Sequence, residues 1–168
     1  MRLLSTITAS TLVILLWPSA AGANQCAPVR TNIVTTYSMG PDCASPVGVC
    51  TTGSIASGKL AGTTHYTALT ITPGPSPDLL FYTGELVITT SAGTLTLRDF
   101  GLLNPVTARF YEVQQIVSGT GAYAGLRGTL TSQGVSTPTG FQGTLSGPVC
   151  NFVERAERIT PWRGFSVP

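Results

Sequence analysis

The segment Ile116–Gln133 reads IVSGTGAYAGLRGTLTSQ and places four glycines between two stretches in which apolar and polar residues alternate. Alternation with a period of two is typical of a β-strand with one buried face. Glycine permits the positive φ angles and the close backbone approaches that a tight turn requires. The segment therefore predicts two strands joined by a short glycine-rich turn.

The same glycines do not match a phosphate-binding loop. The dinucleotide-binding pattern has two residues between its second and third glycines and a helix directly after them. Here three residues separate Gly121 from Gly125, and the LRGTLTSQ that follows alternates like a strand. No Lys-Ser or Lys-Thr pair follows the glycines either. They therefore indicate a fold and not a nucleotide site.

Strand-like segments recur along the rest of the chain at short spacing. The clearest pair flanks Ser91-Ala92-Gly93, a three-residue connection with glycine where a positive φ is needed. The predicted strands are Thr31–Ser38, Thr51–Leu60, Thr63–Thr72, Phe81–Thr90, Thr94–Phe100, Val106–Ser118, Gly125–Gln133 and Phe141–Gly147. About eight short strands separated by turn signals favour one all-β domain, either a closed antiparallel barrel or a sandwich.

The N-terminus has the features of a cleavable export signal. Arg2 supplies the positive charge, Leu12–Trp17 a short apolar core and Ala21–Ala23 a small-residue cleavage site. The apolar run is far shorter than the roughly 20 residues that span a bilayer, so no membrane anchor is expected after the signal is removed. Gln25 before Cys26 argues against lipidation, which favours a small residue there. We expect a secreted or periplasmic protein.

These features divide the chain into a signal peptide at 1–23, a β-barrel domain at 24–150 and a C-terminal tail at 151–168. In the tail, Asn151 and Glu154 resemble a capping box, and Glu154 with Arg158 forms a helix-compatible pair. We expect this tail to be either a short helix across one end of the barrel or a frayed terminus.

The four cysteines all follow the predicted signal, and exported proteins pair their thiols as disulfides. Of the pairings that four cysteines allow, we expect Cys43–Cys50 together with Cys26–Cys150. The first closes the loop CASPVGVC, and the second joins the two ends of the domain. In the chain-entropy model, a disulfide that closes a loop of more than about 100 residues stabilises the fold by roughly 4–5 kcal/mol. One that closes the short loop contributes less than about 3 kcal/mol.

Charge is sparse: 10% of the residues are charged, against about 25% in a typical soluble domain. Lys59 is the only lysine and there is no basic run, so the chain offers no surface for nucleic acid. His65 is the only histidine, which excludes a histidine-based metal cluster. We expect neither a metal nor a cofactor. A hydrolase is also disfavoured, because no Gly-x-Ser-x-Gly elbow is present.

The glycine segment resembles the allene oxide cyclase/dirigent barrel family. Those proteins carry Gly-Gly-Ser/Thr-Gly-x-[Phe/Tyr]-x-Gly-x-x-Gly after a strand, and Ser118–Gly128 matches this pattern except that Ser118 replaces the first glycine. Gly84–Asp99 looks like the preceding hairpin of small exported bacterial members, and Gly143–Gly147 fits the closing strand. The resemblance covers roughly Gly84 to Gly147.

This resemblance implies an eight-stranded antiparallel, calycin-type barrel with an apolar central cavity, found in homo-oligomers such as dimers or trimers. Plant cyclases bind an epoxide fatty acid in that cavity, and dirigent proteins orient phenoxy radicals or cyclise intermediates there with acidic and aromatic residues. The catalytic residues of these relatives do not align with this chain, so the activity does not transfer with the fold.

Period-two counting suggests which polar residues lie on apolar strand faces. His65 shares a face with Leu69 and Ile71, Asp99 with Leu95 and Leu97, and Glu112 with Phe110 and Ile116. If these faces point inward, the three polar groups lie in or near a low-dielectric cavity. Buried carboxyls there would have raised pKa values and could act as general acids. The candidate ligand-contacting residues are Tyr66, Tyr82 and Tyr111.

Structural explanations stand beside these functional ones. Asp99 could cap the loop from Gly101, Glu112 could pair outside the barrel with Arg98 or Arg109, and His65 could be a half-exposed strand residue. The tyrosines could serve packing alone. We therefore expect a non-catalytic protein that binds a small apolar molecule or acts as a scaffold. The alternative is a cofactor-free cyclase or isomerase that uses Asp99, Glu112 or His65 as acid/base groups.

Overall fold

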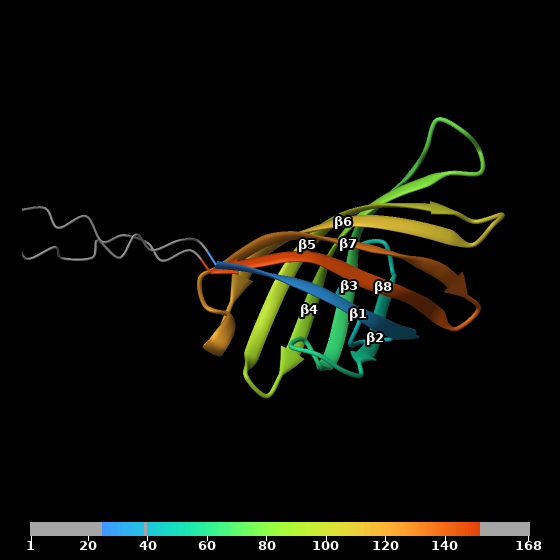
Figure 1. Cartoon of the computed structure of the whole chain (residues 1–168). Coiled ribbons are helices and arrows are strands. Elements are labelled where there is room, and N and C mark those ends of the chain that lie inside the picture. Colours follow the sequence, from blue (N-terminus) through green and yellow to red (C-terminus); the bar gives the residue numbers. More distant parts are fainter. Residues whose placement is uncertain (1–24, 39, 152–168) are drawn as a thin grey trace, which may run out of the picture.

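The eight strands follow one another around a closed barrel, and the last strand pairs with the first (Figure 1). The computed structural model describes residues 25–38 and 40–151. The strands are β1 (Gln25–Ser38), β2 (Cys50–Ile55), β3 (Gly62–Pro73), β4 (Leu80–Thr90), β5 (Gly93–Asn104), β6 (Arg109–Gly119), β7 (Leu126–Thr137) and β8 (Gly140–Asn151), with a 3-10 turn η1 (Gly121–Tyr123). All neighbouring strands are antiparallel. The predicted all-β, eight-stranded antiparallel barrel is confirmed, and the sandwich alternative is excluded.

One predicted strand starts later in the structure. Val106–Ser118 was expected to be continuous, but β6 begins at Arg109 and β5 extends to Asn104. The side-chain oxygen of Asn104 accepts hydrogen bonds from the backbone N–H groups of Val106 (3.0 Å) and Thr107 (2.8 Å). Asparagine thereby closes the β5–β6 turn through its side chain, a local arrangement that competes with strand pairing.

The barrel has two distinct ends. We call the end that carries the β2–β3, β4–β5 and β6–β7 connections the floor, and the opposite end the mouth. Gln25 and Asn151 are directly paired at the floor, so both limits of the described chain leave from that end (Figure 1). The predicted signal peptide at 1–23 and nearly all of the tail at 151–168, including its proposed helix, lie outside the described residues.

The apolar core fills the floor half of the barrel, where inward-facing side chains alternate with outward-facing ones along each strand. An eight-stranded barrel is narrow enough for its side chains to fill. The core consists of Ile33, Ile55, Leu60, Leu86, Ile88, Leu95, Leu97, Ile116, Tyr123, Leu130 and Leu145. It ends at the level of Ile33 and Leu86, which also line the cavity above it.

The glycine segment closes the floor. Gly121 has a φ of +58°, and a Cβ there would overlap the carbonyl oxygen of Ala92 in the β4–β5 turn. Only glycine permits both the conformation and the contact. The turn inserts Tyr123 into the core, where its hydroxyl donates to the carbonyl of Lys59 at 2.7 Å. The segment thus packs the floor in addition to joining β6 to β7.

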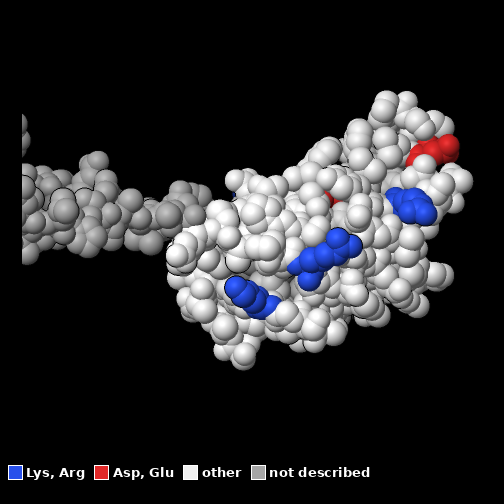
Figure 2. Space-filling model, in the orientation of Figure 1, with Lys and Arg blue, Asp and Glu red and all other residues white. Residues whose placement is uncertain are grey.

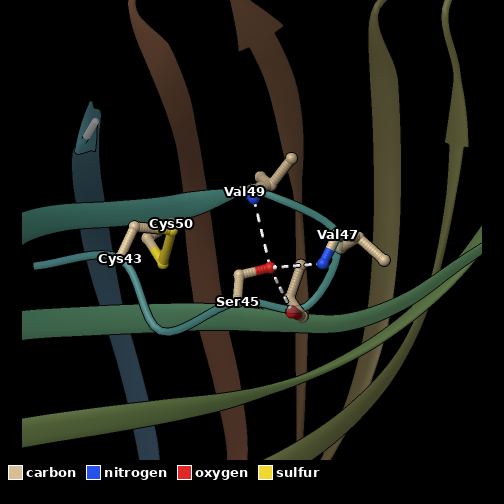
Figure 3. Close-up of a disulfide and its surroundings, with 6 residues drawn as sticks. Cys43, Ser45, Val47, Val49 and Cys50 are labelled. Carbon is tan, nitrogen blue, oxygen red and sulfur yellow. Dashed lines mark hydrogen bonds between the residues drawn. A yellow bond between two sulfur atoms is a disulfide. The ribbon is translucent and has the colours of Figure 1, made fainter. Parts of the chain in front are cut away.

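Two disulfides join Cys26 to Cys150 and Cys43 to Cys50, which are the pairs expected from the sequence. The first links directly opposed residues of β1 and β8. The second stabilises the β1–β2 connection at the mouth, where the Ser45 hydroxyl donates to the carbonyl of Ala68 at 2.6 Å and accepts from two backbone N–H groups of its own loop (Figure 3). The disulfides are consistent with an oxidising, extracytoplasmic environment.

The outer surface carries few charges. Figure 2 shows basic side chains separated by wide uncharged areas on one face of the barrel. The ion pair between Arg98 and Glu85, at 3.9 Å, lies on the outside, with 69% and 39% of the two side chains exposed. Within residues 25–38 and 40–151, no helix is long and apolar enough to cross a membrane.

Candidate functional site

A cavity of about 340 Å³ occupies the mouth half of the barrel. This is near the lower end of the roughly 300–1,000 Å³ range of small-molecule sites. Its lining is mostly apolar and aromatic. Phe141 of β8 lies edge-on to Phe110 of β6 and to Tyr37 of β1, with ring centroids 5.5 and 5.6 Å apart. These three rings form a continuous aromatic wall near the mouth.

Six polar side chains interrupt the apolar interior at mid-height, on the arc formed by β3 to β7. We call this group the polar belt. It consists of Tyr66, Tyr82, Asp99, Glu112, Gln114 and Ser132. All of them except Asp99 line the cavity directly. Asp99 is 6% exposed and does not line the cavity.

Glu112 is held in place by its neighbours in the belt. The Tyr82 hydroxyl donates to Oε1 of Glu112 at 2.8 Å, and the side-chain nitrogen of Gln114 donates to Oε2 at 2.8 Å. Tyr82 reaches Glu112 by crossing Gly101, which is paired with both residues on the strand between them. A Cβ at Gly101 would overlap the Tyr82 ring, so glycine is what allows this crossing.

A similar arrangement occurs one strand earlier along the barrel, except that Tyr66 is paired with Leu86 and reaches the glycine diagonally. Tyr66 on β3 lies over Gly84 on β4, and Gly84 is paired with Asp99 on β5. A Cβ at Gly84 would overlap the Tyr66 hydroxyl. This copy of the arrangement is incomplete, because neither carboxyl oxygen of Asp99 nor the Tyr66 hydroxyl has a hydrogen-bond partner within the described chain.

Burial dominates the protonation behaviour of both carboxyls. It raises the pKa of Glu112 to about 7, helped by the negative charge of Asp99 and opposed by hydroxyl and amide donors of the belt. Burial likewise raises the pKa of Asp99 to about 6, although the nearby Tyr66 hydroxyl and backbone N–H groups lower it. The pKa values of Tyr66 and Tyr82 are raised far above the ordinary tyrosine value by burial and by the adjacent carboxyls. Both tyrosines therefore remain neutral donors.

The structure brings together four of the six residues singled out from the sequence: Asp99, Glu112, Tyr66 and Tyr82. Asp99 lies within β5 and does not cap a loop, because that strand continues to Asn104. Glu112 points into the cavity, while Arg98 pairs with Glu85 outside.

His65 and Tyr111 lie elsewhere. His65 is half-buried on the outer face of β3 and does not line the cavity. The sequence places it on the same face as Ile71, but the register of β3 shifts between Ala68 and Thr70, and only Ile71 reaches the cavity. Tyr111 is 41% exposed on the outer face of β6.

Gln114 and Ser132 belong to the site although sequence reasoning did not single them out. Gln114 follows Glu112 by two residues, and Ser132 is directly paired with Glu112 on β7. The spacing of Gln114 was available from the sequence, but Gln115 beside it is equally polar, so composition alone did not distinguish the inward side chain. The position of Ser132 depends on the register between two strands.

The fold and the site define an eight-stranded antiparallel barrel with an apolar cavity, one carboxyl group in its lining and a second buried nearby. Comparisons of this chain with protein-family models, with curated proteins and with solved structures found no match. The function is therefore inferred from the shape and the lining of the cavity.

Proposed function

We propose that this protein is an exported barrel that binds a small, mostly apolar molecule in its cavity. The observation that carries the proposal is the 340 Å³ cavity, whose apolar walls and few convergent polar groups are the usual features of a ligand site. The two disulfides support export, since such bonds persist in oxidising compartments. Amino-terminal sequencing of the exported protein is expected to start at Asn24.

Native mass spectrometry of the purified protein tests the binding. We expect a mass increment that disappears on denaturation, together with saturable binding of apolar probes. Ala68→Phe places a ring in the cavity from β3 and is expected to abolish both signals. Leu69→Phe, at the next and exposed position, is the matched control and should leave them unchanged. Probe binding that survives Ala68→Phe would contradict a cavity site.

A cofactor-free isomerase or cyclase is the second candidate, and the paired carboxyls favour it. A general acid or base works best with a pKa near the operating pH, and burial brings the pKa of Glu112 to about 7. Kinship with the allene oxide cyclase/dirigent barrels would agree with this activity. The test is turnover of a candidate substrate by the wild type and by Glu112→Gln. Catalysis requires that turnover falls at least about 100-fold while binding is retained, in line with typical acid–base contributions.

A further inference from the structure

The polar belt holds unpaired acceptors and one unpaired donor, the Tyr66 hydroxyl, within the described chain. Both carboxyl oxygens of Asp99 and the side-chain oxygen of Gln114 have no partner in the described part of the chain. Asp99 is 6% exposed and Gln114 is 2% exposed, so bulk water does not satisfy them. Buried polar atoms are nearly always paired in folded proteins. Asp99 does not line the cavity and has the Tyr66 hydroxyl beside it, whereas Gln114 lines the cavity. An occupant with an N–H donor would therefore satisfy the side-chain oxygen of Gln114.

Above about pH 7 the belt carries negative charge without a counter-charge. Asp99 is buried and Glu112 is partly buried, and of the residues that the structure describes, no lysine, arginine or histidine lines the cavity. The nearest basic residues along these strands are Arg98 and Arg109, which are exposed on the outer face. A buried charge is stabilised mainly by an opposite charge or by hydrogen bonds. The cavity therefore disfavours an anionic ligand and favours a cationic one.

Aromatic rings surround the space in front of the belt. Tyr66, Tyr82, Phe110 and Phe141 all line the cavity, as does Glu112, and the rings of Phe110 and Phe141 are in edge-to-face contact. The faces of such rings attract cations, and their carbon atoms equally suit an apolar body. A ligand with a cationic head and an apolar body matches both parts of the lining.

We propose that the natural ligand is a primary amine carried on a small apolar body, with its ammonium group at the polar belt. The ammonium donates to Glu112 and Gln114, which line the cavity, and the nearby Asp99 adds to the negative charge that it meets. This inference rests on the proposed binding function and specifies its ligand class. It also separates this barrel from a binder of fatty acids, whose carboxylate would meet two like charges here.

Three probes with the same apolar body test the inference: phenylbutylamine, phenylbutanol and phenylbutyrate. Titration calorimetry with the oxidised full chain at about pH 8, above the pKa values of both carboxyls, gives the three affinities. We expect the amine to bind most tightly and the acid most weakly, with at least about a tenfold difference between them. An acid that binds as tightly as the amine would overturn the inference while leaving the binding function intact. Failure of all three probes to bind would count against the binding function itself.

Glu112→Gln removes the charge but keeps the shape of the side chain. It should lower the affinity for the amine at least about tenfold and leave that for the alcohol within about twofold. Retained alcohol binding reports that the variant is folded. Glu85→Gln removes an acid on the outer face and is the matched control, with no change for any probe. An amine affinity unchanged by Glu112→Gln would contradict an ammonium site at the belt.

Discussion

The Tyr82 hydroxyl donates to Oε1 of Glu112 from two strands away, across the bare backbone of Gly101. This contact and the hydrogen bond from Gln114 to Oε2 together fix the orientation of the Glu112 carboxyl group. The Tyr66 hydroxyl lies beside Asp99 in the equivalent position but completes no hydrogen bond. The Glu112 carboxyl is therefore oriented by hydrogen bonds within the protein, whereas the carboxyl oxygens of Asp99 have no partner in the described chain.

The stability of the unliganded protein should fall as the pH rises from about 4 to about 7. The ordinary pKa values of Asp99 and Glu112 are 3.8 and 4.5, and in the folded protein they rise to about 6 and about 7. The folded state therefore holds protons that the unfolded chain has released over this range. Linkage then lowers the free energy of unfolding by up to roughly 3 kcal/mol per carboxyl as the pH increases.

Urea denaturation of the wild type and of Glu112→Gln measures this effect. The variant lacks one titrating group, so its loss of stability between about pH 4 and pH 8 should be smaller by up to roughly 3 kcal/mol. Glu85→Gln, which alters an exposed acid, should follow the wild-type curve. A wild type that gains stability over this interval would show that the buried carboxyls do not control it.

Replacement of Gly101 by alanine should break the Tyr82–Glu112 contact. The added Cβ overlaps the Tyr82 ring and not a flexible chain end, so the ring must move. We expect a loss of about 1–3 kcal/mol in the free energy of unfolding, typical of overpacking. In a Tyr82→Leu background the same substitution should be less destabilising. A double-mutant cycle measures the difference, and strict additivity would contradict the contact.

Tyr123 should matter for stability through its hydroxyl as well as its ring. That hydroxyl is the donor to the carbonyl of Lys59 and lies 3.0 Å from the Thr90 hydroxyl. Tyr123→Phe removes the donor to the Lys59 carbonyl at the floor, while the Thr90 hydroxyl keeps its bonds to Ala92 and Gly93. We expect the free energy of unfolding to fall by about 1–2 kcal/mol. Tyr111→Phe changes an exposed tyrosine and should be neutral within about 0.5 kcal/mol. Equal effects of the two substitutions would contradict a structural role for the glycine segment.

Ser45→Ala should loosen the mouth without unfolding the barrel. The Ser45 hydroxyl accepts from the N–H groups of Val47 (3.2 Å) and Val49 (3.1 Å), besides its bond to Ala68 (Figure 3). We expect faster hydrogen exchange at those two amides and a stability loss of about 1–2 kcal/mol. Ser76→Ala removes a single contact in an exposed loop and serves as the control. Unchanged exchange at Val49 would contradict the role of this hydroxyl.

The barrel was predictable because nearly every strand has a buried face and ends at a turn signal. The inward side of β6 was harder to assign, since Tyr111, Val113 and Val117 make its outer face apolar too. When both faces of a strand are apolar, period-two counting cannot tell the inward face from the outward one. His65 was placed with Ile71 because a β-bulge leaves no clear mark in the sequence. One extra residue is enough to change which side chains face inward.

The polar belt could be predicted only in part. Asp99 and Glu112 are conspicuous in the sequence because acids are rare on apolar strand faces. Their relation to Tyr66 and Tyr82 runs across glycines of the intervening strands, directly at Gly101 and diagonally at Gly84, and is set by strand register. Register cannot be read from a single strand.

The positions of Gln25 and Asn151, the limits of the described residues, have a practical consequence. Gln25 and Asn151 are paired at the floor, while the cavity lies in the mouth half. A label, a fused domain or a solid support joined directly at Gln25 or Asn151 would therefore lie at the end of the barrel opposite the cavity. Immobilised in this way on a sensor chip, the barrel would present its mouth to the flowing solution.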